Sequence, residues 1–279
     1  MSDRQDWADV SSLLKNIYRC ADKSSWYDGV AEAYDRTRAR YPAEILARMQ
    51  KIALLQPGKS VLEIGAGPGI ASIELAKLGA ATTCLEPSRS ACELARRKCA
   101  GYPNVEFINS TFEAWDLSDR QFDAVIATTS FHWLTPEARN QKTAAALKED
   151  GLLILLWNTP PQPSYQVHQT LREVYQTHAP ELAKYESHQS HRQNLVKIAD
   201  GTIESGYHNL ITQEQISKIT YTIDDYLTLL STLSPYIRLD SQQRSLLFAD
   251  LKRALELNYG DKLDLTYLSL LQIAHKRQQ

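Results

Sequence analysis

Val61-Leu62-Glu63-Ile64-Gly65-Ala66-Gly67-Pro68-Gly69 is the stretch of sequence that decides the fold. It begins as an apolar strand and runs into three glycines at alternate positions, with a carboxylate two residues before the first glycine. A strand, a glycine-rich turn and a helix in this order bring backbone N–H groups and the positive end of a helix dipole to a bound polar group. The stretch therefore predicts a site for a nucleotide-like ligand.

Short apolar runs alternate with helical patterns over residues 59–158, which is typical of parallel strands joined by crossover helices. The expected strands are residues 60–64, 81–86, 105–109, 122–128 and 152–158. Helices are expected before Gly79 and over residues 88–99. The apolar content of the strands predicts burial on both faces of the sheet.

The segments on either side of this alternating region are predicted to be mainly helical. Before it, one apolar stripe places Tyr27 and Tyr34 on the same helical face. After it, residues 164–260 read mostly as helices, with a polar surface loop expected at 188–208.

Two later apolar runs, residues 218–223 and 265–274, are predicted to be strands that complete the sheet, although the leucines of the second run also fit a helix. The expected division of the chain is an N-terminal helical lid segment at 1–56, a cofactor-binding core at 57–160, a helical cap or substrate region at 161–260 with one core strand near 218–223, and the last core strand with the C-terminus at 261–279.

Composition restricts the class of ligand. The chain has 279 residues, of which 43% are hydrophobic, and this length fits one large domain or a domain with a substantial insertion. The formal net charge is only -2, so neither a polyanion-binding surface nor an acidic tail follows from composition. A neutral or small ligand is expected.

The four cysteines are Cys20, Cys84, Cys92 and Cys99, which lack the close spacing of a zinc ribbon and are expected to be buried thiols. The first residues contain no apolar signal core, and the longest apolar run, residues 152–157, is far below the ~20 residues of a membrane helix. We expect a reduced, cytoplasmic protein without membrane association.

The glycine turn departs from the dinucleotide fingerprint Gly-x-Gly-x-x-Gly, because Ile70 stands where the third glycine belongs and Gly69 comes one residue early. The arrangement Glu-x-Gly-x-Gly-x-Gly, which begins at Glu63, resembles the first motif of class I S-adenosylmethionine-dependent methyltransferases. Glu86 stands where this family places an acidic residue that bonds both ribose hydroxyls of the cofactor. The resemblance implies an α/β, Rossmann-like, doubly wound seven-stranded sheet, mostly parallel with an antiparallel last strand, and a helical cap insertion.

The same resemblance implies which residues hold S-adenosylmethionine. Thr111 occupies the usual place of an adenine-binding Asp, with Phe112 positioned to pack on the ring and Glu113 as a replacement carboxylate. The residues expected to bind the cofactor are Glu63, Gly65, Ala66, Gly67, Gly69, Glu86, Pro87, Ser88, Thr111, Phe112, Glu113 and Thr128.

Residues 122–134 resemble the fourth strand and following loop of the branch that includes trans-aconitate methyltransferases. Members of that branch often carry a His-Trp pair after this strand, a Tyr-rich N-terminal helix and an Asn after the fifth strand, and the resemblance implies a small-molecule acceptor. The residues expected to bind it are Tyr27, Tyr34, Arg38, Trp133 and Asn158.

His132 is the candidate catalytic residue, as a general base near neutral pH, and the alternative is a structural residue packed beside Trp133. If the acceptor carries a carboxylate, Arg38 could hold it through a two-pronged hydrogen bond, although a solvated arginine is the alternative. A carboxylate acceptor would need no protein base.

Other function classes stay open at this point. An NAD-type oxidoreductase shares the acid and the turn but is opposed by Ile70, and a non-catalytic S-adenosylmethionine-binding protein fits the same motifs. His188 and His191 could bind a metal if their segment is helical, yet no Cys or acidic ligand lies beside them, and no metal is expected. No basic stripe predicts a nucleic-acid partner, and the oligomeric state stays unknown.

Overall fold

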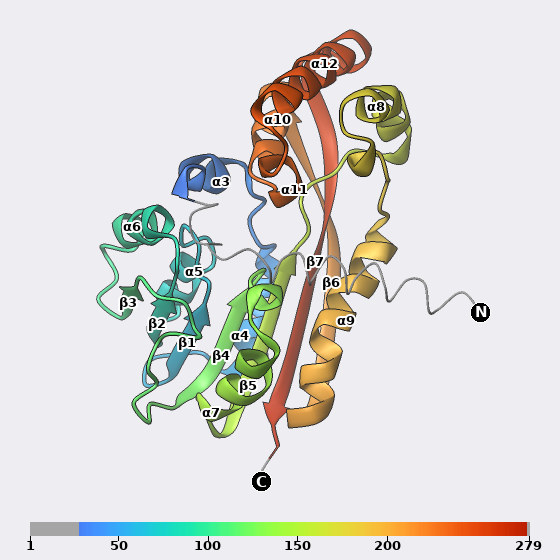
Figure 1. The fold of residues 1–279 in the computed structure, drawn as a ribbon. Helices are drawn as coiled ribbons and strands as arrows, with labels where there is room; N and C mark the ends of the chain where they lie inside the picture. Colours follow the sequence, from blue (N-terminus) through green and yellow to red (C-terminus); the bar gives the residue numbers. More distant parts are fainter. Residues whose placement is uncertain (1–27, 278–279) are drawn as a thin grey trace, which may run out of the picture.

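A seven-stranded sheet in the order β3-β2-β1-β4-β5-β7-β6 runs through the molecule (Figure 1). The computed structural model describes residues 28–277, so Cys20 and Tyr27 lie outside the described residues. The strands are β1 (Ser60–Ile64), β2 (Ala81–Leu85), β3 (Val105–Ile108), β4 (Phe122–Thr128), β5 (Leu147–Asn158), β6 (Tyr207–Thr222) and β7 (Lys262–Lys276). Neighbours among β1 to β5 pair in parallel, whereas β7 is antiparallel to both β5 and β6. The expected mixed, doubly wound sheet is confirmed.

The described helices lie on both faces of the sheet and beyond its upper end (Figure 1). They are α3 (Ala31–Thr37), α4 (Ala43–Ala53), α5 (Ser72–Lys77), α6 (Arg89–Lys98), α7 (Thr143–Ala145), α8 (Tyr165–His178), α9 (His188–Gly206), α10 (Ile223–Ser231), α11 (Ser234–Ile237) and α12 (Ser241–Tyr259). Shorter 3-10 or π turns are η1 (Phe131–Trp133), η2 (Ala138–Lys142) and η3 (Pro180–Leu182). Over residues 28–277, none of these helices is both long and apolar enough to cross a bilayer.

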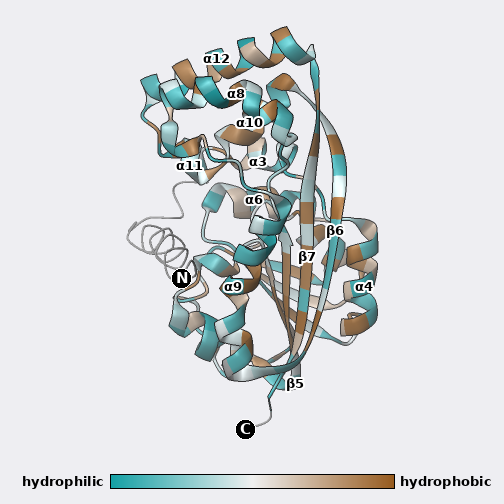
Figure 2. Ribbon diagram, turned by 90° about the vertical axis from the view of Figure 1, so that its right-hand side faces the viewer, coloured by the Kyte–Doolittle hydropathy of each residue, from teal (hydrophilic) through white to brown (hydrophobic). Residues whose placement is uncertain are grey.

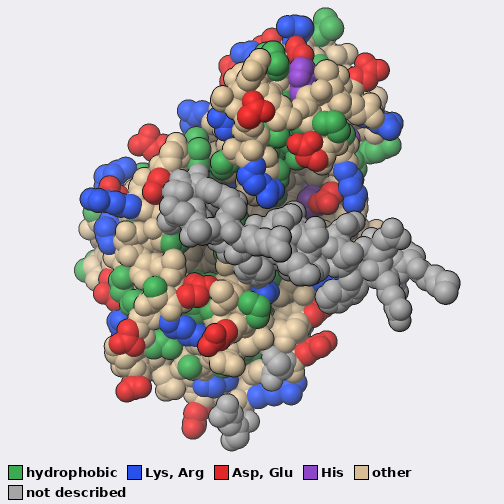
Figure 3. Space-filling view, in the orientation of Figure 1, with side chains coloured by type: hydrophobic (Ala, Val, Ile, Leu, Met, Phe, Trp, Pro, Cys, Tyr) green, Lys and Arg blue, Asp and Glu red, His purple; other side chains and the backbone are tan. Residues whose placement is uncertain are grey.

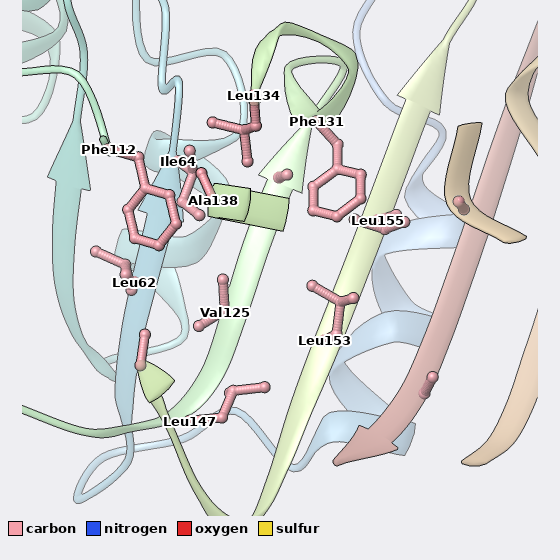
Figure 4. Packing of buried hydrophobic residues seen from close by; sticks show 14 of the residues in the cluster. Leu62, Ile64, Phe112, Val125, Phe131, Leu134, Ala138, Leu147, Leu153 and Leu155 are labelled. Carbon is pink, nitrogen blue, oxygen red and sulfur yellow. The ribbon is translucent and has the colours of Figure 1, made fainter. Parts of the chain in front are cut away.

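Alternation of side chains along the central strands divides the core between the two faces of the sheet. Leu62 and Ile64 point to one face, where they join Phe112, Phe131 and other buried side chains (Figure 4). Val61 points to the other face and joins Ile45 of α4 and Leu75 of α5, among others. The strands are therefore buried on both faces, as their apolar sequences predict.

The cap has a hydrophobic core of its own. Leu171 of α8, Leu229 of α10 and Leu251 of α12 are fully buried together with Leu263 and Leu265 at the start of β7. In Figure 1 these helices gather around the upper end of β6 and β7, beyond the parallel part of the sheet. The last two strands thus support the cap as well as complete the sheet.

The prediction of a surface loop at residues 188–208 is wrong, because α9 occupies almost all of this segment. The Ser187 hydroxyl accepts the Ser190 N–H at the start of the helix. Leu195, Ala199 and Ile203, spaced by four residues, pack onto the core along one face. The strand expected at 218–223 is also longer than its sequence suggests, since β6 begins directly after α9.

Candidate functional site

A cavity of about 790 Å³ lies at the carboxyl ends of the parallel strands. Its lining includes residues at or just beyond the ends of β1, β2, β3, β4 and β5, together with residues of α3, η1, α9 and α11. This is the usual place of a ligand site in an open α/β sheet. The lining residues expected from the sequence are Tyr34, Arg38, Gly65, Gly67, Glu86, Pro87, Thr111, Phe112, Glu113, Thr128, His132, Trp133 and Asn158.

The glycine turn closes one side of the cavity. Gly65 and Gly67 have φ angles of 69° and 56°, a region that side chains with a Cβ rarely adopt. A Cβ at Gly65 would lie only 2.6 Å from the Cβ atom of Ser130, in the loop after β4. The backbone N–H of Gly65 donates to the carbonyl of Leu85 at 2.8 Å, which holds the turn against the end of β2. Glycine is therefore required at Gly65 both by conformation and by space.

Glu63 does not line the cavity, although the sequence places it among the cofactor-binding residues. Its fully buried carboxylate accepts hydrogen bonds from the Ser72 hydroxyl, from the Cys84 thiol at 3.3 Å and from the Thr128 hydroxyl at 3.1 Å. Burial raises the pKa of this carboxyl group above its ordinary value. The observed role of Glu63 is to join β1 to α5, β2 and β4.

Three further residues expected at the cofactor lie outside the cavity lining. Gly69 packs against Ala95 of α6, where an added Cβ would lie 3.1 Å from the Ala95 Cβ. Ser88 caps α6 by accepting the Ala91 N–H at 3.3 Å. Ala66 is buried beside the turn. These positions shape the glycine turn and the start and packing of α6.

Glu86 presents a buried carboxylate to the cavity. One oxygen accepts the Gly67 N–H at 2.7 Å and the other accepts the Ser88 N–H at 2.8 Å. Burial raises the pKa of Glu86 to about 7 despite these hydrogen bonds. Each carboxylate oxygen has further lone pairs, so the group can accept two hydroxyl hydrogen bonds from the cavity side.

The loop after β3 provides the next wall. The Thr111 hydroxyl accepts the Ala114 N–H at 3.1 Å, so it organises its own turn. A Glu113 carboxylate oxygen accepts the Thr135 N–H at 3.1 Å, which links this loop to the segment after η1. The Phe112 ring is almost fully buried, and the Lys142 ammonium lies 5.2 Å from its centroid. This wall therefore combines one buried aromatic ring with polar side chains whose hydrogen bonds fix the loop.

Aromatic rings surround His132 at the far side of the cavity. Its ring centroid lies 5.0 Å from that of Trp133 and 5.8 Å from that of Trp157, a fully buried residue of β5. The placement of His132 in the lining is compatible with either proton transfer or packing. An aromatic enclosure of this kind keeps water away from a reacting centre.

Arg38 is the cation of the cavity lining on the side of α3. Its guanidinium stacks over the Tyr34 ring at 4.4 Å, and its Nη2 atom donates to the Thr232 carbonyl at 3.3 Å. Its Nε atom is buried without a hydrogen-bond partner. Because Arg38 lines the cavity and carries a permanent positive charge, it can pair with an anionic ligand group.

Asn158 lines the cavity, but its amide is already used by the protein. Its Nδ2 atom donates to the Ala39 carbonyl at 3.0 Å, and its Oδ1 atom accepts the Ser269 hydroxyl at 2.6 Å. The Thr129 hydroxyl lies 3.1 Å from the Asn158 backbone nitrogen and 3.1 Å from the Tyr41 hydroxyl. Asn158 therefore fixes the segment between α3 and α4 over the end of the sheet.

Several lining residues are absent from the set predicted by sequence. Trp157 and Ser130 flank predicted positions, whereas His191 and Leu195 of α9 and residues 233–235 of the cap come from distant segments. The imidazole of His191 lies 3.4 Å from a Glu186 carboxylate oxygen. Burial lowers the pKa of His191 below its ordinary value. The helical spacing within α9 is the one sequence signal that could have indicated its contribution.

Comparison with known proteins identifies the segment that carries the glycine turn. Residues 61–151 match a family model described as a methyltransferase domain. An uncharacterised methyltransferase of Mycobacterium tuberculosis is 29% identical over 138 residues, which cover 50% of this chain and 54% of the relative. A demethylmenaquinone methyltransferase of Clavibacter sepedonicus is 31% identical over 148 residues, which cover 50% of this chain and 60% of that protein. The chain thus spans about half the length of these curated relatives.

The fold of this chain is also similar to that of a solved methyltransferase structure. The solved structure of a protein assigned to the type II methyltransferases, from Anaeromyxobacter dehalogenans, matches with a TM-score of 0.59 at 18% identity, over 86% of this chain and 97% of that chain. At this identity the match concerns the fold alone. The family match therefore identifies residues 61–151, which carry the glycine turn, as a methyltransferase domain, and the structural match gives it a methyltransferase fold.

Proposed function

We propose that this protein transfers the methyl group of S-adenosylmethionine to a small-molecule acceptor by direct in-line displacement. The observation that carries this proposal is that Glu86, the glycine turn, Arg38 and His132 line one and the same cavity. The cofactor supplies a methyl group on a sulfonium; the acceptor lone pair forms the new bond, and the carbon–sulfur bonding pair stays on sulfur, which leaves S-adenosylhomocysteine. The protein residues bind, orient and exclude water.

The residues at the donor end fit the cofactor. The free lone pairs of Glu86 suit the two ribose hydroxyls, because its backbone hydrogen bonds hold the carboxylate in place. Gly65 and Gly67 leave the chain close to the cavity without side chains. Thr111, Phe112 and Glu113 provide the wall for the adenine ring. Pro87 and Thr128 complete this end.

At the acceptor end we propose a carboxylate-bearing small molecule. The place of Arg38 in the cavity lining supports this class, since its guanidinium can pair with an anionic group. The resemblance of His132-Trp133 and Asn158 to the trans-aconitate methyltransferases supports the same class. Tyr34 and Trp133 would then form walls, with His132 and His191 as proton acceptors only if the methylated atom carries a proton.

Surface charge favours a small molecule over nucleic acid. On the face seen in Figure 3, the blue and red side chains of the described residues are interspersed and do not gather into one basic stripe. Binding of nucleic acid depends strongly on such clustered positive charge. Phosphate-backbone contacts therefore have little support on this face.

Calorimetry with S-adenosylmethionine tests the donor assignment. We expect Glu86→Ala to weaken binding by about 10-fold to 100-fold, because charge-assisted hydrogen bonds contribute about 1.5–3 kcal/mol each. Arg97→Ala on the exposed face of α6 is the matched control and should bind as wild type does. Equal affinity in Glu86→Ala and wild type would remove the ribose assignment, and tight binding of NAD in place of S-adenosylmethionine would favour an oxidoreductase.

Product analysis tests the acceptor assignment. S-adenosylhomocysteine should form with members of a panel of small carboxylic acids, and Arg38→Ala should raise KM for them by about 10-fold to 100-fold with little change in cofactor affinity. Arg36→Ala, at an exposed pair with Asp225, is the control. Cofactor binding without turnover on any acceptor would instead favour a non-catalytic binding protein.

A further inference from the structure

The outer strand β6 exposes alternate side chains along its middle. It ends the order of strands in the described sheet, and Figure 2, which views this side of the molecule, shows it rising from beside α9 and α4 toward the cap. Its exposed positions are Thr212, Glu214, Ile216, Lys218 and Thr220. Ile216 at their centre is 58% exposed. A long edge strand with an exposed apolar centre is a template for pairing with another strand.

The backbone of β6 is oriented for such pairing. Opposite Ile216 lies Leu268, whose carbonyl accepts the Thr159 N–H on the far side of β7. Opposite Lys218 lies Thr266, whose N–H and carbonyl both bond to the loop after β5 on that same far side. Each of these two opposite pairs is therefore a non-hydrogen-bonded pair of the antiparallel ladder. In such a pair, the backbone N–H and carbonyl groups of the two residues point away from each other. The N–H and carbonyl of Ile216 and Lys218 therefore point outward from the sheet edge.

The sequence of this strand is complementary to itself. Glu214 and Lys218 lie two residues before and two residues after Ile216, and Thr212 and Thr220 lie four residues before and after it. If two copies of the strand run antiparallel about a two-fold axis at Ile216, Glu214 of each faces Lys218 of the other. The threonines then face each other as well. Opposite charges and Thr pairs at facing positions each stabilise a strand pair by roughly 0.2–1 kcal/mol.

We propose that two copies of this chain associate through β6, antiparallel and two-fold about Ile216, to form one continuous sheet. Each facing pair that points outward exchanges two backbone hydrogen bonds, and the two isoleucines cover each other. Glu214 also pairs with Arg192 of its own chain, yet its side chain remains half exposed and accessible to a second cation. Because the contact involves one strand from each copy, the affinity should lie in the micromolar range. This inference does not depend on the reaction proposed above.

Sedimentation velocity over the micromolar range tests the charge pairing. Wild type should shift from monomer to dimer with concentration, and Lys218→Glu and Glu214→Lys should each weaken the dimer at least 10-fold, because like charges then face each other at both pairs. The double variant Glu214→Lys/Lys218→Glu should dimerise again. A mixture of the two single variants should form the heterodimer, since every facing pair is then opposite in charge. Arg97→Glu on α6, with the same change of charge, should dimerise as wild type does.

The backbone requirement is tested by Ile216→Pro. Because the Ile216 N–H points outward, proline there leaves the β6–β7 ladder intact but removes a donor from the proposed interface. We expect a folded monomer with a melting temperature close to that of wild type. Wild type that remains monomeric throughout, single charge variants that dimerise as wild type does, or dimerisation of Ile216→Pro would each overturn the proposal.

Discussion

The Lys98 ammonium lies 2.7 Å from an Asp35 carboxylate oxygen and 3.0 Å from the Pro68 carbonyl, so one side chain of α6 holds both α3 and the glycine turn. Asp28 adds a second link, because its carboxylate accepts the Ser88 hydroxyl at 2.6 Å. On its other side, α3 contacts α10 of the cap through Arg36. The helix α3 thus bridges the core and the cap beside the cavity.

Removal of this link should loosen the donor end. We expect Lys98→Met to weaken S-adenosylmethionine binding by about 3-fold to 10-fold and to lower the free energy of unfolding by about 1 kcal/mol or less, since both side chains are partly exposed. Calorimetry and urea unfolding measure the two effects. Lys77→Met, which breaks an exposed pair with Glu74 on α5, is the control. Equal cofactor affinity in the two variants would contradict a role for Lys98 at the site.

Stability without cofactor should depend on the protonation of Glu86. Its pKa is about 7 in the folded protein and 4.5 as the ordinary value, so the folded state binds the proton more tightly. The contribution of Glu86 to the free energy of unfolding therefore decreases as the pH rises from about 4.5 to about 7, and it becomes constant above that pH.

Thermal unfolding of wild type and Glu86→Gln across this pH window isolates the effect. The stability of wild type relative to the variant should decrease with rising pH, because the variant cannot titrate at this position. Burial also raises the pKa of Glu63, which is present in both proteins, so the difference between them reports Glu86 together with its repulsion from Glu63. A difference that is constant with pH would show that burial does not perturb Glu86.

The two glycines at the cavity should differ in their tolerance of alanine. Gly65→Ala combines a positive φ with a Cβ contact of 2.6 Å to Ser130, and we expect it to lower the free energy of unfolding by about 3 kcal/mol. Gly67→Ala has a positive φ but no atom within 4 Å of the added Cβ, so about 1 kcal/mol is expected. Urea unfolding measures both, and equal losses would argue against the steric contribution of Ser130.

Asn158 should act mainly through stability. Asn158→Asp removes the donor to the Ala39 carbonyl and places a carboxylate beside that oxygen, which should lower the free energy of unfolding by about 1–3 kcal/mol. Residues 38–42 should then become more sensitive to limited proteolysis. Asn194→Asp, on α9 in the same cavity lining, is the control. Wild-type stability in Asn158→Asp, with lost turnover, would instead place Asn158 on the acceptor.

The sequence predicts the parallel strands well because their apolar runs are short and bounded by glycines and polar residues. It also predicts that Gly65, Glu86 and Thr128 meet, since the carboxyl ends of parallel strands share one edge. The prediction was wrong for α9, whose apolar stripe is diluted by polar residues on its other faces. The helix is stabilised by packing of its apolar face, which includes Leu195, against the core, and the local sequence does not show which residues will be available for that packing.

Side-chain direction limits what the sequence says about the site. Glu63 lies close to the glycine turn in sequence, but successive side chains of a strand alternate between the two faces, and Glu63 points toward Ser72 of α5. His191 and Leu233 reach the cavity from segments far away in the sequence. Their contribution depends on how α9 and the cap pack against the sheet, which no local spacing expresses.

The pairing of Thr222 with Lys262 has a consequence for protein engineering. Thr222 and Lys262 are neighbours across the paired ends of β6 and β7, and all of α10, α11 and α12 lies between them in sequence. The intervening segment therefore leaves and re-enters the sheet at a single point, where a related segment that keeps the packing on α8 and on the start of β7 could be spliced. A chimera that takes this segment from a related protein would exchange the cavity wall around Leu233 while the strand ends and Glu86 stay unchanged.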